Sequence, residues 1–154
     1  MKLVVAAFGR LRSRELAAIA GDYLKRLGRY GPAEALELRD ERGEDPASRR
    51  KEAERLEAAL RPGDHLVLLD ERGKQLSSPE LAALIAERSR AGGAGRLVFA
   101  VGGPFGVDES VRRRANQVLS LSRMTLPHEL ARVVLLEQLY RAWTILRGEK
   151  YHHG

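Results

Sequence analysis

The chain has 154 residues, of which 44% are hydrophobic and 31% are charged, and its formal net charge is +6. This length and composition suit one globular domain, 1–154, and no apolar run approaches the roughly 20 residues that a membrane-spanning helix needs. Because the chain contains no cysteine, disulfides, thiolate nucleophiles and cysteine metal sites are excluded. The first residues lack the pattern of a secretory signal, so we expect a cytoplasmic protein.

The first half of the chain predicts two pairs of strand and helix. Residues 3–8 form a continuous apolar run, which is typical of a buried strand. Residues 13–28 predict a helix, because a serine can cap its start, apolar residues recur at every third or fourth position, and a glycine follows. Residues 35–38 predict a short strand, and residues 45–60 predict a polar helix that begins with Asp-Pro.

The middle of the chain continues this alternation. Residues 65–69 predict a buried strand, which a turn at 71–74 follows. Residues 77–80, Ser-Ser-Pro-Glu, carry a capping box and a helix-start proline, and the glycine-rich segment 91–95 ends that helix.

Three short elements precede the last helix. Residues 97–101 and 118–121 predict strands, and residues 108–115 have the length of one short helix. Strands that are separated by helices pair mostly in parallel. We therefore expect an α/β fold with a mostly parallel sheet that helices cover on both faces.

The last helix begins after Pro127 and is apolar around most of its circumference. One face of a sheet does not cover such a helix, so either it lies at the centre of its own domain or one side meets a second subunit. We favour a homodimer.

The positive charge is concentrated near this helix. Residues 111–154 carry 8 Lys and Arg against 3 Asp and Glu, whereas residues 1–110 carry 19 against 18. A basic segment fits a polyanionic partner, because phosphates bind Lys and Arg, but it fits an arginine-rich solvated surface equally well.

Three predicted strands end at Leu69-Asp70, at Val101-Gly102-Gly103 and at Leu121-Ser122. Ligands bind at the carboxyl ends of parallel strands, so these segments predict one pocket. The glycines allow close backbone approach, although a tight turn alone is the simpler reading. The turn matches neither G-x-G-x-x-G nor a P-loop, which argues against a dinucleotide or triphosphate site.

Further candidates follow this turn. The backbone of residues 121–126 can read an adenine edge, and His128 is either structural or catalytic. Glu137 and Arg141 form an i, i+4 ion pair or mark a polar pocket. The tail 151–153, Tyr-His-His, is either disordered or folded over a site, and adjacent histidines are poor ligands for one metal, so we expect none.

Taken together, these segments resemble the bacterial RlmH family of ribosomal large-subunit (pseudouridine-N3)-methyltransferases over essentially the whole chain. Tail sequences in this family vary after the Tyr-His pair, so the resemblance assigns no role to His153. The segments that carry the resemblance are Leu66–Lys74 with Ser77-Ser78, Val101–Gly106, Leu119–His128, Glu137–Trp143 and Arg147–His153.

The resemblance implies a SPOUT-type α/β fold with a deep C-terminal trefoil knot, and an obligate homodimer. It places the knot and the cofactor region at about 66–154. It also implies S-adenosyl-L-methionine as the cofactor, held by Leu69, Gly102, Gly103, Leu121, Ser122, Arg123, Met124, Thr125 and Leu126.

The implied reaction is methyl transfer to N3 of a pseudouridine in large-subunit (23S) ribosomal RNA of the assembled ribosome, without a metal. Our hypothesis is that the tail of one subunit covers the pocket of the other, and the alternative is that it covers the pocket of its own subunit. The catalytic candidates are Tyr151, His152, His128, Glu137 and Arg141. The candidates for RNA binding are Arg112, Arg113, Arg114, Arg123, Arg132 and Arg147.

Two other classes of function use the same features. A noncatalytic RNA-binding module uses the basic surface without binding S-adenosylmethionine. A small-molecule α/β enzyme binds a cofactor and ignores ribosomes.

Overall fold

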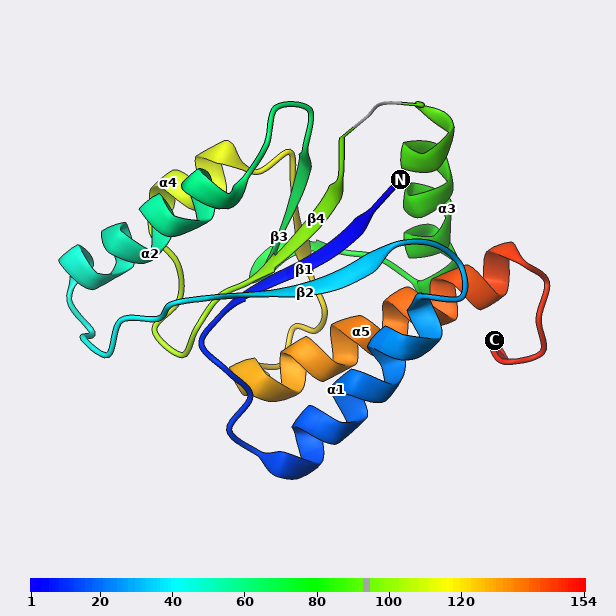
Figure 1. Cartoon of the computed structure of the whole chain (residues 1–154), viewed down its shortest axis with the longest axis horizontal. Coiled ribbons are helices and arrows are strands. Elements are labelled where there is room, and N and C mark those ends of the chain that lie inside the picture. The colour runs from blue at the N-terminus through cyan, green and yellow to red at the C-terminus, as the bar shows by residue number, and fades with distance from the viewer. Residues whose placement is uncertain (93–94) are drawn as a thin grey trace.

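A five-stranded parallel sheet forms the centre of the chain in our computed structural model, which describes residues 1–92 and 95–154 (Figure 1). The strand order is β2-β1-β4-β3-β5, and every neighbouring pair runs in parallel. The expected parallel α/β sheet is therefore confirmed. The strands are β1 Leu3–Phe8, β2 Ala33–Leu38, β3 His65–Gln75, β4 Leu97–Val101 and β5 Gln117–Ser120.

Helices cover both faces of the sheet, as predicted (Figure 1). One face packs against α1, α3 and α5, and the other packs against α2 and α4. The central strands are apolar on both sides because both faces are covered. The helices are α1 Arg14–Leu27, α2 Pro46–Ala59, α3 Ser78–Arg90, α4 Glu109–Arg114 and α5 His128–Leu146.

The predicted helix starts are confirmed by their caps. The side chains of Ser13 and Asp45 accept hydrogen bonds from backbone amides of the first turns of α1 and α2. Ser77 and Glu80 form the complete capping box at the start of α3. Each cap satisfies an amide that has no partner within its helix. The predicted end of α3 spans 91–95, of which residues 93 and 94 lie outside the described residues.

Helix α5 is enclosed within the chain. It packs between α1 and α3 against the sheet, and α1 and α3 both contact it extensively. Its buried residues include Val133, Leu136, Leu139 and Ala142. A central position in its own domain thus accounts for most of its apolar circumference, and the homodimer stays a prediction.

The predicted turn at 71–74 was wrong, because β3 continues through this segment to Gln75. Leu119 of β5 pairs first with Leu69 and then with Lys74, so β3 bulges between these two residues. A Cβ atom on Gly73 would lie 2.7 Å from backbone atoms of Val118 and Leu119. Only glycine permits this approach of the two strands. The trefoil knot stays a prediction.

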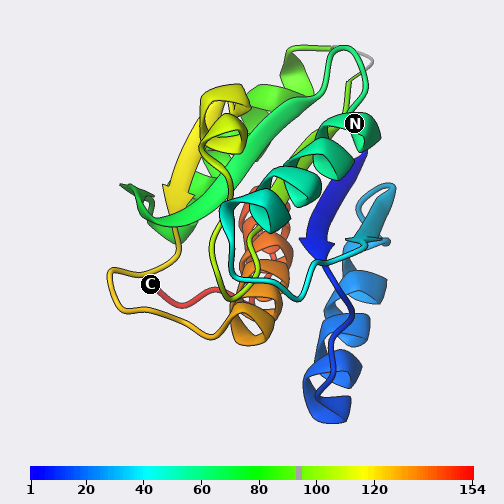
Figure 2. The same cartoon turned by 90° about the vertical axis from the view of Figure 1, so that its left-hand side faces the viewer.

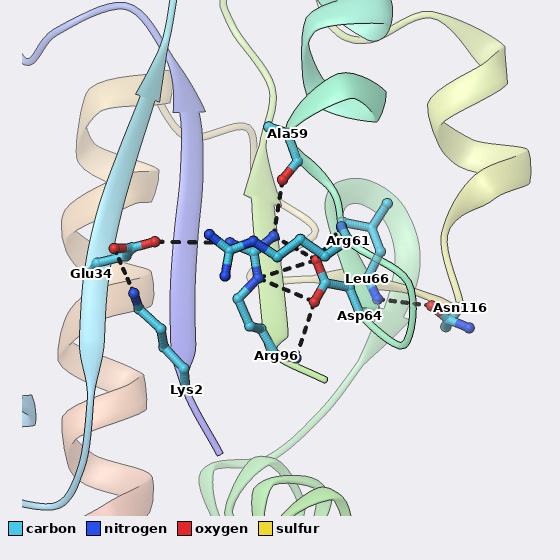
Figure 3. A network of polar contacts seen from close by, with 8 residues as sticks. All are labelled: Lys2, Glu34, Ala59, Arg61, Asp64, Leu66, Arg96 and Asn116. Atoms are coloured by element: carbon cyan, nitrogen blue, oxygen red, sulfur yellow. Dashed lines mark hydrogen bonds and ion pairs between the residues drawn. The ribbon is translucent and has the colours of Figure 1, made fainter. Parts of the chain in front are cut away.

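A buried ion pair ties together the amino-terminal ends of the strands, opposite the ends that carry the predicted pocket (Figure 3). The Arg96 guanidinium donates to both carboxylate oxygens of Asp64, with the shortest distance at 2.6 Å, and to the carbonyl of Ala59 at 2.9 Å. Glu34 of β2 lies 3.9 Å from the same guanidinium and 2.8 Å from the Lys2 ammonium.

Candidate active site

A cavity of about 820 Å³ opens where β3, β4 and β5 end. These are the three strand ends that the sequence predicted to converge. The segment between β5 and α5 arches away from the sheet and bounds one side of it (Figure 2). The lining residues are Leu69, Asp70, Glu71, Arg72, Val101, Gly102, Gly103, Pro104, Gly106, Val107, Leu121, Ser122, Met124, Thr125, Leu126, Pro127, His128 and Ala131.

The glycine turn after β4 forms one wall of the cavity. The Gly106 amide donates to the Gly103 carbonyl at 3.1 Å, and Gly106 has a φ of +79° that favours glycine. At Gly103 an added Cβ atom would meet nothing within 4 Å. Gly103 therefore faces open space beside the cavity, whereas Gly106 is needed to close the turn.

The segment 121–126 forms the opposite wall, and short polar contacts hold it in place. The Ser122 hydroxyl accepts a hydrogen bond from the Met124 amide at 2.9 Å. The Thr125 hydroxyl donates to Glu71 at 2.8 Å, which joins this segment to the bulge of β3. Met124 is 79% exposed. The wall is thus tied to the sheet and carries an apolar side chain at its outer edge.

An ion pair at the rim of the cavity joins Asp70 of β3 to Arg112 of α4, with 2.6 Å between the guanidinium and the carboxylate. Burial alone would raise the pKa of Asp70. The hydrogen bonds from Arg112 and from the Arg72 amide outweigh it, so the pKa lies below its usual value. Asp70 therefore stays ionised at neutral pH and fixes the first basic residue of α4 beside the cavity.

A second polar group, which we call the tail cluster, comprises Glu137, Arg141, Tyr151 and His152. The Arg141 guanidinium donates to Glu137 at 2.6 Å and lies 3.2 Å from Nδ1 of His152. The Tyr151 hydroxyl donates to Glu137 at 3.0 Å. Burial and hydrogen bonds to Tyr23 and Glu137 raise the pKa of Tyr151 above its ordinary value. The tail is thus anchored to α5 by several contacts.

The tail cluster lies apart from the cavity of its own chain. His128 lines the cavity, whereas Glu137 is nine residues farther along α5, about 14 Å at 1.5 Å per residue. The tail follows the far end of α5, and the segment 121–127 meets its beginning (Figure 1). The structure therefore groups four of the five catalytic candidates with one another and the fifth, His128, with the cavity.

Comparisons with known proteins assign the family. The profile of the family described as "Predicted SPOUT methyltransferase" matches residues 1–152. This chain belongs to that family. Its relatives include proteins named "Ribosomal RNA large subunit methyltransferase H". The one from Geobacter metallireducens is 47% identical over the full length of both chains. The one from Desulfovibrio desulfuricans is 50% identical over 94% of this chain and 93% of its own.

A solved structure shares the fold of this chain. The structure titled "Crystal Structure of Probable Methyltransferase from Bordetella pertussis Tohama I" has a TM-score of 0.60. The match covers 91% of this chain and 93% of the Bordetella chain. Because the two sequences are only 14% identical, the match shows the fold alone. The motif-based resemblance is confirmed, and the protein is a methyltransferase with the fold of the SPOUT family.

Eight of the nine residues predicted to hold the cofactor line the cavity of this SPOUT methyltransferase, and Arg123 does not. Sequence reasoning missed five lining residues: Glu71, Arg72, Val107, Pro127 and Ala131. The first four lie next to segments that were predicted to form the pocket, and this proximity is the signal that would have found them. Ala131 lies in α5, one turn after His128.

The six arginines predicted to bind RNA differ in their surroundings. Arg113, Arg123 and Arg147 are exposed, and Arg114 pairs with Glu57 at 3.5 Å. The prediction for Arg132 was wrong: this residue is only 4% exposed and donates to Glu37 at 2.9 Å and to the Gly9 carbonyl at 3.0 Å. Its guanidinium ties α5 to β1 and β2, so it is not available to a phosphate.

Two further observations concern only residues 1–92 and 95–154. No group of three or more His, Asp or Glu side chains there is arranged to hold a metal ion. No helix in these ranges is long and apolar enough to cross a membrane.

Proposed function

We propose that this chain methylates N3 of a pseudouridine in large-subunit ribosomal RNA, with S-adenosylmethionine as methyl donor. We further propose that it acts on the assembled ribosome as a cytoplasmic homodimer of one domain per chain. The observation that carries the proposal is the cavity at the ends of β3, β4 and β5. It occurs in a chain that is 47% identical over its full length to a "Ribosomal RNA large subunit methyltransferase H".

The cavity fits S-adenosylmethionine in size and chemistry. Its volume of about 820 Å³ lies within the range of small-molecule sites, about 300–1,000 Å³. Leu69, Val101 and Leu121 supply apolar surface for a flat ring, and the open space beside Gly103 would be filled by any side chain. Backbone amides and carbonyls of 121–126 offer partners for an adenine edge.

The bound cofactor would supply an electrophilic methyl group on its sulfonium. The residues of the chain would then position the base, exclude water and accept the proton of N3. Positioning alone can remove a large part of the barrier, because a bound nucleophile in line with the methyl carbon has already lost its translational freedom. The remaining requirement is a group that reaches N3 directly or through one water.

The tail cluster offers the groups that this step requires. Arg141 can only donate hydrogen bonds, so Nδ1 of a neutral His152 accepts from it and Nε2 carries the ring proton. His152 would therefore donate a hydrogen bond to a carbonyl oxygen beside N3. With its raised pKa, Tyr151 stays protonated at neutral pH and orients Glu137 or the base. Glu137 is then the carboxylate of the cluster that can accept a proton.

The proposed homodimer would bring this cluster to a cavity. The tail is held against its own α5 through Glu137, which lies about 14 Å along that helix from His128 of the same chain. A contribution across the dimer needs no detachment of the tail, which supports action on the partner's cavity. Leu130 and Leu146, which remain exposed at the two ends of α5, provide apolar surface for such an interface.

Two measurements test this proposal. Calorimetry with S-adenosylmethionine should show binding, which a noncatalytic RNA-binding module would lack. Labelled methyl should then appear in large-subunit RNA of ribosomes, in preference to free RNA. If the protein binds S-adenosylmethionine but transfers no labelled methyl to ribosomes, it is a methyltransferase of small molecules. That result would refute the proposed RNA substrate.

A further inference from the structure

Phe105 is a large aromatic residue in the glycine turn 102–106, whose other residues line the cavity. Its neighbours Pro104 and Gly106 line the cavity, whereas Phe105 does not. The residue is 45% exposed. A single exposed apolar side chain needs no explanation by itself. Phe105 differs from such residues because another side chain lies against its ring.

Arg49 of α2 supports the Phe105 ring. Its guanidinium carbon lies over the ring, 5.4 Å from the centroid. Arg49 is only 7% exposed, and its guanidinium donates to the carbonyls of Gly43 at 2.9 Å and Glu41 at 3.3 Å. Its Nε lies 3.4 Å from a carboxylate oxygen of Glu52. The cation is therefore fixed by loop carbonyls and a carboxylate.

A buried guanidinium lies under this exposed ring. Burying a charge is unfavourable unless it is paired and hydrogen-bonded. Arg49 has Glu52 and two carbonyls as partners, and only its Nε lacks a hydrogen bond. An aromatic side chain that only covered the core would not need a cation beneath it. The arrangement instead keeps the ring in one orientation while nearly half of the residue stays in solvent.

The surface around Phe105 is basic. Arg50 of α2 and Arg113 of α4 are both exposed, and neither lies within 4.0 Å of a carboxylate oxygen among the described residues. Both lie close enough to Asp108 to help lower the pKa of that carboxyl, after its larger hydrogen bonds with Ser110. Asp108 is three residues from Phe105. Two exposed cations without an ion pair thus lie near Asp108, three residues along the chain from Phe105.

We propose that Phe105 is a stacking platform for the base of a nucleotide that neighbours the methylated one. This inference rests on the proposed function, since it requires an RNA substrate. The target base enters the cavity, the adjacent base stacks on the open side of the Phe105 ring, and Arg50 and Arg113 contact the intervening phosphates. Proteins that recognise unpaired RNA bases commonly stack them on aromatic side chains between cationic groups.

Substitutions of Phe105 test the platform through the KM for ribosomes. Phe105→Ala should raise this KM about tenfold, as expected for one lost base stack. The turnover number and the affinity for S-adenosylmethionine should stay within about twofold of wild type, because Phe105 does not line the cavity. Phe105→Trp should keep the wild-type KM, and Phe105→Leu, which is apolar without a flat ring, should behave like the alanine variant.

Co-sedimentation with ribosomes provides a second readout that does not depend on turnover. Phe105→Ala and Phe105→Leu should both bind ribosomes about tenfold more weakly, while Phe105→Trp binds like wild type. The inference is overturned if Phe105→Ala keeps the wild-type KM, or if leucine restores function as well as tryptophan. A changed oligomeric state of Phe105→Ala would also overturn it, since Phe105 would then contact protein. Failure of the wild-type protein to methylate ribosomes would instead refute the proposed function.

Discussion

The hydroxyl of Tyr151 donates a hydrogen bond to Glu137 at 3.0 Å, which joins the C-terminal tail to the middle of α5. The Tyr151 ring also packs edge-on against Tyr140, with 4.8 Å between the centroids. The hydroxyl and the ring of Tyr151 therefore have separate partners, and a substitution can remove one contact while keeping the other.

Tyr151→Phe should reduce methyl transfer to ribosomes by about a hundredfold, the scale of one proton-transfer or orienting group. The ring keeps its packing on Tyr140, so the tail should stay folded and the affinity for S-adenosylmethionine should change by less than about twofold. The matched control is Tyr30→Phe, which also removes a hydroxyl bond to a glutamate, here Glu149 at 2.8 Å. Equal losses in the two variants would show that anchoring the tail, and not the Tyr151 hydroxyl, is what matters.

Mixed dimers distinguish a tail that acts on the partner from one that acts on its own chain. Tyr151→Phe should be nearly inactive alone, and so should Gly103→Ala when S-adenosylmethionine is kept well below the Kd of that variant. If the tail reaches the partner, a mixed dimer combines one intact cavity with one intact tail and regains about half of the wild-type rate per mixed dimer. If dimers that are shown to be mixed regain no activity, the tail acts on the cavity of its own chain.

Gly103→Ala tests the cofactor site directly. Because an added Cβ meets nothing within 4 Å and Gly103 has no positive φ, the free energy of unfolding should stay within about 0.5 kcal/mol of wild type. The affinity for S-adenosylmethionine, measured by calorimetry, should fall at least about tenfold if the cofactor occupies that space. Gly21→Ala on α1, also with no neighbour within 4 Å, is the control and should not alter the affinity. If Gly103→Ala binds S-adenosylmethionine as tightly as the wild type, the cofactor does not occupy the space beside Gly103.

The Asp64–Arg96 pair predicts how stability depends on pH. Burial would raise the pKa of Asp64, but hydrogen bonds from Arg96 and from two backbone amides keep it below the ordinary value. A lowered folded-state pKa stabilises the protein above the unfolded-state pKa, and this contribution is lost as pH falls through the folded-state pKa.

Asp64→Asn should therefore lower the free energy of unfolding at pH 7 by about 3 kcal/mol, because Arg96 stays buried without its anion. It should also weaken the loss of stability in acid, as measured by urea unfolding between pH 7 and pH 2. Asp22→Asn breaks only a half-exposed pair with Arg26 and should cost less than about 0.5 kcal/mol. Similar costs for both substitutions would contradict a structural role for the buried pair.

Local patterns in the sequence were sufficient for most of the fold and for the position of the cavity. Ser77 and Glu80 act within one helical turn, and the ends at Leu69, Gly102 and Leu121 converge because parallel strands share one edge. The role of Arg132 was not predictable in this way, since its partner Glu37 is 95 residues away along the chain. Only the contacts of Arg132 with Glu37 of β2 and with the Gly9 carbonyl after β1 show that this arginine is engaged within the fold.

The same limit applies to the segment 70–75 and to the tail. The polar residues 71–74 look like a turn, but β3 continues through them and pairs with β5 again at Lys74, with Gly73 close to the backbone of Val118. The tail residues Tyr151 and His152 carry no periodic pattern, so their order arises from contacts with α5 and with Tyr23 of α1.

The most direct test of the proposed function is nucleoside mass spectrometry of large-subunit RNA. Ribosomes that lack the modification would be incubated with this protein and S-adenosylmethionine carrying a labelled methyl group. We predict one labelled nucleoside, N3-methylpseudouridine, at one position of that RNA, and its absence with Gly103→Ala. A labelled methyl group on another atom, or no label in ribosomal RNA from an enzyme that binds the cofactor, would contradict the proposal.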